Sequence, residues 1–154
     1  MAPPCSRENL RITSHRQQQL EEREGRVQLA QLAPNGSAQL WSLVDTDDGR
    51  SFIVSSSSGL KLEDRDGLVG LHPDSGAFQV WSLQPIDDGC YLLEGHRFQF
   101  LEDRYGELKV SADDGEWQKW SIRTSAGAAP CLPGGCCAGR LSCMPCNIWS
   151  GAWR

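Results

Sequence analysis

The 154-residue sequence contains little lysine and no long apolar segment. The formal net charge is −5, and the only lysines are Lys61, Lys109 and Lys119. Because nucleic-acid binding depends on clustered basic side chains, this composition argues against a nucleic-acid partner. A membrane-spanning helix needs about 20 consecutive apolar residues, and the sequence has no such run. The N-terminal residues also lack the apolar segment of a signal peptide, which predicts a cytoplasmic protein.

Motifs typical of enzymes and metal sites are also missing. The sequence contains neither a G-x-S-x-G nor an H-E-x-x-H motif, and its three histidines, His15, His72 and His96, share no metal-ligand spacing. The acidic residues recur at turns, where Asp and Gly are favoured for conformational reasons. We therefore predict a protein that is not an enzyme and uses no cofactor. A glycoside hydrolase with paired carboxylates is the one enzyme class left open by the sequence.

A unit of about 40 residues occurs three times in the sequence, and this repeat is its main feature. Each copy carries a Q-x-W-S marker, at residues 39–42, 79–82 and 118–121. Each copy also carries an L-E-x-R-x-G marker, at residues 20–25, 62–67 and 101–106. Because the two markers keep the same order and spacing, we interpret them as one structural unit repeated three times.

The local pattern within each unit predicts short β-strands. An alternating apolar run follows each L-E-x-R-x-G marker, and such period-2 alternation is typical of a half-buried strand. The acidic-Gly turn between two short strands indicates a hairpin, because Gly accepts positive φ without strain. Residues 16–23 have helical propensity, but they align with 58–65 and 97–104, so we predict strand and turn there too. This gives four strands per repeat and about twelve in all.

Three units that each end in Q-x-W resemble the ricin-type β-trefoil, in which a six-stranded barrel is capped by three hairpins. The resemblance predicts an all-β fold, and the looser similarity to a β-propeller fragment is disfavoured because propellers need at least four blades. The predicted organisation is an N-terminal extension (1–8), a trefoil domain (9–124) and an irregular Cys-rich tail (125–154). The three repeats of the trefoil would span about residues 9–48, 49–88 and 89–124.

The resemblance also assigns structural roles within each repeat. Trp41, Trp81 and Trp120 would be buried in the barrel, as expected of large aromatic side chains. The glutamines of the marker, at positions 39, 79 and 118, would brace the loops.

Carbohydrate binding is the function that the resemblance implies, through a carboxylate, an aromatic platform and an amide. The carboxylate position carries Glu21, Glu63 and Glu102 in the three repeats. The platform position carries Ala30, His72 and Ser111, and the amide position carries Ala38, Phe78 and Trp117. The second repeat, with Glu63, His72 and Gln79, is the best candidate sugar site. Glu102 and Trp117 of the third repeat are further candidate ligand-binding residues, with Trp117 either an exposed anchor for a partner or a cover for the barrel.

A protein-interaction function is the alternative to a sugar-binding one. The same unit also resembles fascin-like and hisactophilin-like trefoils, which are cytosolic proteins that bind actin. The repeated Arg23, Arg65 and Arg104 could form a small basic cluster, but each has carboxylate neighbours, so we expect mutual neutralisation. The predicted partner is thus a glycan or a protein such as actin, and the protein is expected to be a monomer by default.

The tail differs sharply in composition from the repeats. It carries five of the seven cysteines, namely Cys131, Cys136, Cys137, Cys143 and Cys146. We predict a poorly ordered extension. Two alternatives are lipidation of the adjacent Cys136 and Cys137 and a zinc site that includes the C-x-x-C pair Cys143 and Cys146, a weak candidate without a second properly spaced pair.

Overall fold

The computed structural model describes residues 7–86 and 90–127, and within them the regular structure is almost entirely β. The first repeat contains β1 (Leu10–Ser14), β2 (Gln19–Arg23), β3 (Arg26–Ala30), a 3-10 turn η1 (Ser37–Gln39) and β4 (Trp41–Asp45). The second contains β5 (Ser51–Ser55), β6 (Lys61–Arg65), β7 (Leu68–His72), η2 (Ala77–Gln79) and β8 (Val80–Pro85). The third contains β9 (Tyr91–Glu94), β10 (Phe100–Arg104), β11 (Glu107–Ser111), η3 (Glu116–Gln118) and β12 (Trp120–Thr124).

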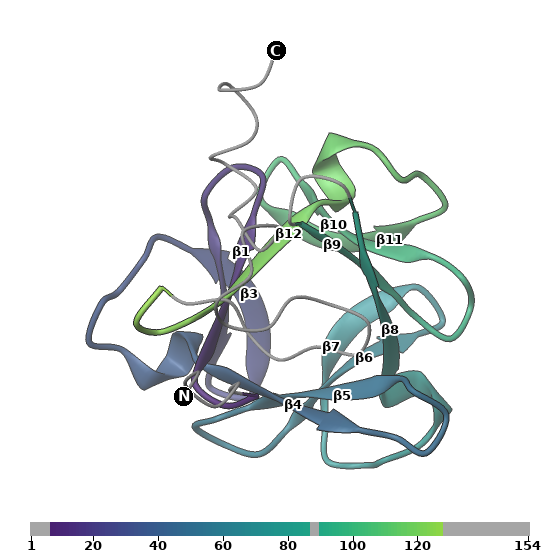
Figure 1. Ribbon diagram of the computed structural model, residues 1–154, viewed down its shortest axis with the longest axis horizontal. Coiled ribbons are helices and arrows are strands. Elements are labelled where there is room, and N and C mark those ends of the chain that lie inside the picture. Colours follow the sequence, from purple (N-terminus) through teal and green to yellow (C-terminus); the bar gives the residue numbers. More distant parts are fainter. Residues whose placement is uncertain (1–6, 87–89, 128–154) are drawn as a thin grey trace, which may run out of the picture.

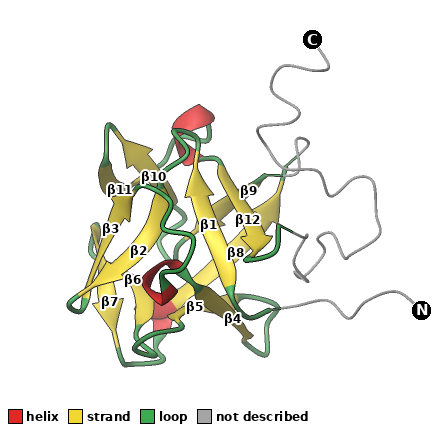
Figure 2. Ribbon diagram, turned by 90° about the vertical axis from the view of Figure 1, so that its left-hand side faces the viewer, coloured by secondary structure: helices red, strands yellow, loops and turns green. Residues whose placement is uncertain are grey.

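Six of these strands close into a barrel. Antiparallel pairing runs from β1 to β4, β5, β8, β9, β12 and back to β1. The other six strands form the hairpins β2–β3, β6–β7 and β10–β11. The view along the barrel shows three similar lobes (Figure 1), and the view turned by 90° shows the three hairpins gathered at one end of the barrel (Figure 2). This is the β-trefoil that the repeat predicted, and closure of the barrel leaves it without an open sheet edge.

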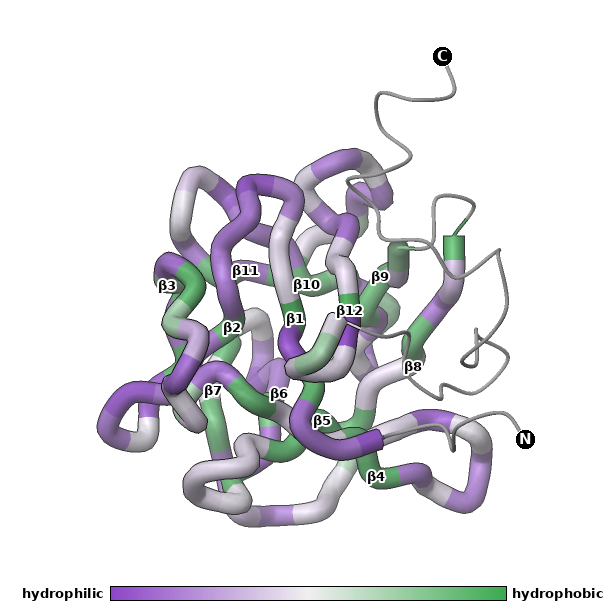
Figure 3. Tube along the Cα trace, turned by 60° about the vertical axis from the view of Figure 1, so that its left-hand side comes forward, coloured by the Kyte–Doolittle hydropathy of each residue, from purple (hydrophilic) through white to green (hydrophobic). Residues whose placement is uncertain are grey.

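The barrel is filled by the repeated tryptophans. Trp41, Trp81 and Trp120 are each 0% exposed. Their indole N–H groups donate to the backbone carbonyls of the leucines that begin the L-E-x-R-x-G markers, at 2.8, 2.9 and 2.9 Å. Green hydrophobic stretches occur along barrel strands such as β8 and β9 (Figure 3). The aromatic ring therefore supplies buried apolar area while its single polar atom is satisfied.

An acidic residue, partly buried in the first repeat and fully buried in the other two, links each repeat to the next one. In the first repeat, Glu22 accepts hydrogen bonds from the hydroxyls of Ser55, at the end of β5, and of Ser57 and Ser58, in the turn between β5 and β6. In the second repeat, Asp64 accepts one from Arg97 Nε at 3.3 Å, in the turn between β9 and β10.

Asp103 links the third repeat back to the first repeat. Its carboxylate accepts hydrogen bonds from Ser14 Oγ at 2.6 Å and from Arg16 Nε at 3.1 Å, in the turn between β1 and β2. The backbone N–H of Gly106 donates to it at 2.8 Å. Asp103 and Asp64 are 0% exposed. The three links join the repeats in a closed ring.

The protein is expected to lose stability as the pH falls, because three carboxylates are better ionised in the folded state. Burial raises the pKa of Asp103, Glu22 and Glu63, but hydrogen bonds from neighbouring groups outweigh it, and each pKa lies below the ordinary value of its carboxyl group. Their contribution is complete above the unfolded-state pKa and is lost as the pH falls through the lower folded-state pKa. Urea midpoints measured from pH 7 to pH 3 should decrease steadily below about pH 5. A midpoint that rises on acidification would contradict these shifts.

Candidate functional site

Each repeat contains the same buried contact between its marker glutamine and its marker glutamate. The side-chain amide of Gln79 donates to Glu63 at 2.7 Å, and that of Gln118 donates to Glu102 at 2.5 Å. The equivalent distance in the first repeat is 3.0 Å. Each glutamine also accepts a hydrogen bond from a backbone N–H of the loop before the 3-10 turn, at 2.7–2.8 Å. The glutamines therefore hold the loops against the hairpins, and the structure brings Glu63 and Gln79 together.

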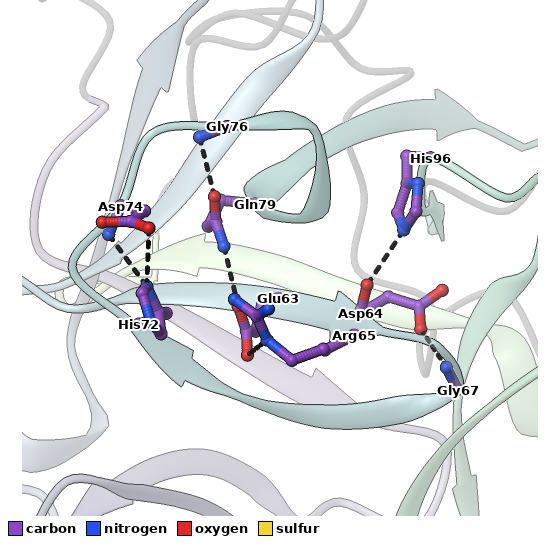
Figure 4. A network of polar contacts seen from close by, with 9 residues as sticks. All are labelled: Glu63, Asp64, Arg65, Gly67, His72, Asp74, Gly76, Gln79 and His96. Atoms are coloured by element: carbon purple, nitrogen blue, oxygen red, sulfur yellow. Dashed lines mark hydrogen bonds and ion pairs between the residues drawn. The ribbon is translucent and has the colours of Figure 1, made fainter.

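An arginine of the same strand also occupies the glutamate. Arg65 binds Glu63 through two nitrogens, at 3.1 and 3.2 Å, whereas Arg104 binds Glu102 through Nε at 2.6 Å. Burial raises the pKa of Glu63, but Arg65 and Gln79 lower it overall. The glutamate side chains are only 8% and 2% exposed. The oxygens of both glutamates are therefore already engaged within the protein, as Figure 4 shows for Glu63, and offer little to a sugar hydroxyl.

Aromatic residues at the amide position cover these arginines. The guanidinium of Arg65 lies 4.8 Å from the ring centroid of Phe78, and that of Arg104 lies 4.9 Å from Trp117. Both distances are typical of cation–π contacts. Sequence reasoning expected neutralisation of the arginines but missed this stacking. Residues two apart on a strand share one face, which pairs Arg65 with Glu63, but Phe78 lies in η2 and no local spacing signals its contact with Arg65.

His72 contacts its own loop. Its Nδ1 accepts a hydrogen bond from the backbone N–H of Asp74 at 3.1 Å, and the Asp74 carboxylate lies 3.5 Å away (Figure 4). The imidazole is partly buried. The second repeat therefore places His72, Glu63 and Gln79 in a network in which each has a partner within the protein.

A surface pocket lies in the third repeat, beside Trp117. It has a volume of about 380 Å³ and is lined by the loop residues Asp113, Asp114, Gly115, Glu116, Trp117 and Gln118. Tyr105, which is 77% exposed, meets the Trp117 ring edge-on with centroids 4.9 Å apart. Of the residues predicted to bind ligand, Trp117 lines this pocket, while Glu102 lies behind Arg104. The sequence analysis did not identify Tyr105 or the acidic loop as candidate site residues, because it considered only the positions that form sugar sites in the ricin-type family.

Two further observations concern metals and membranes. No group of three His, Cys, Asp or Glu side chains in residues 7–86 and 90–127 is arranged to hold a metal ion. In that same part of the chain, no helix has the length and apolarity to cross a membrane. Cys143 and Cys146, the predicted zinc pair, and Cys136 and Cys137, the predicted lipidation sites, lie outside the described residues.

Comparisons with known proteins agree on the fold. No family model matches the sequence, and no curated protein matches it. Among solved structures, ThreeFoil, a designed threefold-symmetric protein, is 25% identical, with a TM-score of 0.65 over 73% of this chain and 96% of ThreeFoil. SeviL bound to the asialo-GM1 saccharide is 19% identical, with a TM-score of 0.67 over 79% of this chain and 98% of SeviL.

A third similar structure is the Polyporus squamosus lectin bound to a human-type influenza-binding epitope, Neu5Aca2-6Galb1-4GlcNAc. It is 15% identical, with a TM-score of 0.62 over 76% of this chain and 49% of the lectin. With the closed barrel and its three hairpins, these matches define the fold of the chain as a β-trefoil. Its structural neighbours include proteins that bind carbohydrate.

Proposed function

We propose that this protein is a non-catalytic carbohydrate-binding module whose ligand site is the pocket beside Trp117. The observation that carries the proposal is the pocket itself, which has a volume of about 380 Å³ and is lined by Trp117 together with the acidic residues Asp113, Asp114 and Glu116. Aromatic rings stack on the apolar face of a sugar, and carboxylates accept hydrogen bonds from its hydroxyls. The volume is within the range of small-molecule sites, about 300–1,000 Å³. The carbohydrate-bound structural neighbours support this assignment.

The proposed site lies in the third repeat because the second repeat differs in its loop. Its corresponding loop, residues 73–78, carries only one acid, Asp74, which contacts His72. Arg65 uses two nitrogens on Glu63 and is covered by Phe78. Arg104 makes the equivalent contacts with Glu102 and Trp117 in the third repeat. The three acids of the third-repeat loop are therefore what distinguish it from the second.

Replacing Trp117 with alanine should abolish glycan binding or weaken it at least about tenfold, because the aromatic wall of the pocket is removed. The measurement is a glycan array with the full chain, followed by titration of the glycans that bind. Phe78→Ala is the matched control, since Phe78 occupies the same position in the second repeat. We expect this variant to bind like the unmodified protein. Circular dichroism of both variants separates loss of binding from loss of fold.

Two other outcomes would redirect the assignment. Loss of binding in Phe78→Ala but not in Trp117→Ala would place the site in the second repeat, with Glu63, His72 and Gln79. If the folded protein bound no glycan on the array, carbohydrate binding would be contradicted. Actin co-sedimentation would then test the cytosolic protein-interaction alternative, with sedimentation velocity testing the expected monomer.

A further inference from the structure

The pocket beside Trp117 differs from the equivalent regions of the other repeats in its charge. Its loop, residues 112–117, carries Asp113, Asp114 and Glu116, whereas the first-repeat loop, residues 33–38, carries no acid. All three acids of the third-repeat loop are exposed. Because the equivalent loop occupies the same place in each repeat, the extra acidic charge is specific to the third-repeat pocket and is not required by the β-trefoil fold.

The basic groups near the pocket do not compensate for all of this charge. Arg104 is held by Glu102 at 2.6 Å, and Lys119 is held by Glu116 at 3.0 Å. The carboxylates of Asp113 and Asp114 form no ion pair among the residues that the structure describes. Arg104 also interacts electrostatically with Asp113, whose charge contributes to raising the Arg104 pKa. With both ion pairs counted as neutral, Asp113 and Asp114 still leave the described wall of the pocket with a net negative charge.

We infer that this pocket selects uncharged saccharides and discriminates against acidic ones that carry a carboxylate or sulfate on the same sugar core. The inference rests on the proposed function and specifies its ligand class. A neutral sugar presents hydroxyl donors to Asp113 and Asp114, whereas an acidic substituent is repelled by them. Specificity of this kind comes from a repulsive element in addition to attractive contacts.

The effect should depend on salt in a defined way. The two carboxylates are exposed, so their repulsion is screened by ions, with a Debye length of about 10 Å at 0.1 M and about 3 Å at 1 M ionic strength. We therefore expect an acidic glycan to bind about five- to tenfold more weakly than the uncharged glycan with the same core at 0.1 M salt. At 1 M salt the difference should fall to about twofold.

The test uses a glycan array printed with matched pairs, in which each core is present with and without a terminal sialic acid or sulfate. Stronger binding of the uncharged member of each bound pair is the expected result. Equal binding, or stronger binding of the acidic member, would overturn the inference while leaving carbohydrate binding intact. No binding of either member would overturn the proposed function, and the inference with it.

A double variant attributes the selectivity to the loop. In Asp113→Asn with Asp114→Asn, the ratio of the two affinities at 0.1 M salt should fall to about twofold or less. The ratio is measured within one variant, so a general loss of affinity cancels. Asp74→Asn makes the same change in the second-repeat loop and should leave the ratio unchanged. A ratio unaffected in the double variant would show that Asp113 and Asp114 are not its source.

Discussion

Replacing Trp81 with alanine is expected to lower the free energy of unfolding by about 3–5 kcal/mol. The side chain is 0% exposed and lies in the barrel with the other two repeated tryptophans. Its removal leaves a cavity and also removes the indole donor to the Leu62 carbonyl, at 2.9 Å. Because single domains are stable by only about 5–15 kcal/mol, this one change should bring the protein close to its unfolding threshold. Urea denaturation followed by circular dichroism measures the loss.

Trp117→Ala is the control for this prediction, since it removes the same residue type from the surface. Trp117 is only partly buried, so the variant should lose much less stability than Trp81→Ala. Trp81→Ala should thus reduce mainly the stability of the fold, whereas Trp117→Ala should reduce mainly glycan binding. Similar losses of stability in both would show that the barrel tryptophan has no special structural role.

Replacing Asp103 with alanine should cost roughly 3 kcal/mol of stability, because it cuts the link between the third repeat and the first. The change leaves three donors without their acceptor, namely Ser14 Oγ, Arg16 Nε and the Gly106 N–H. It also removes a group whose pKa is lowered by these donors against the effect of burial. The variant should therefore show a weaker dependence of stability on pH between about pH 5 and pH 3 than the unmodified protein.

Asp48→Ala is the matched control for the cut link. Asp48 also forms an ion pair with an arginine, and its Oδ2 lies 2.7 Å from Arg50 Nη2. Both side chains are about half exposed. Exposed ion pairs contribute little to stability, so this variant should unfold at nearly the same urea concentration as the unmodified protein. If Asp103→Ala behaved the same way, the contacts between repeats would be incidental to folding.

The sequence predicted the architecture well because its markers fall at positions that the fold itself constrains. A tryptophan that recurs every 40 residues indicates a repeated core position, and the L-E-x-R-x-G marker indicates a repeated hairpin. The expected number of strands and the strand assignment of residues 19–23 are both confirmed. The helical propensity there was overridden because β2 pairs with β3 and with β1.

The details of the site were harder to predict because they depend on side-chain directions and on contacts between repeats. The glutamate of each marker was recognised, but the acid that follows it, Glu22, Asp64 or Asp103, was not. The partner of this second acid is Arg16 or Arg97 in two links and a set of serines in the third. These partners are distant in sequence and differ chemically. The pairing of Arg65 and Arg104 with carboxylates was expected, but their stacking on aromatic rings was not. The pocket beside Trp117 follows from the path of its loop.

The ring of links implies that no repeat is structurally first. β1 pairs with β12 along its whole length, with Leu10 opposite Thr124, so the seam where the domain begins and ends is a hairpin-like contact similar to those within it. The Asp103 contact with Ser14 crosses this seam in the same way that Asp64 and Glu22 cross the two internal boundaries. The order in which the chain visits the three lobes is therefore incidental to the closed structure. A gene that started at another turn and joined the present ends by a short linker would encode the same cyclic arrangement of contacts.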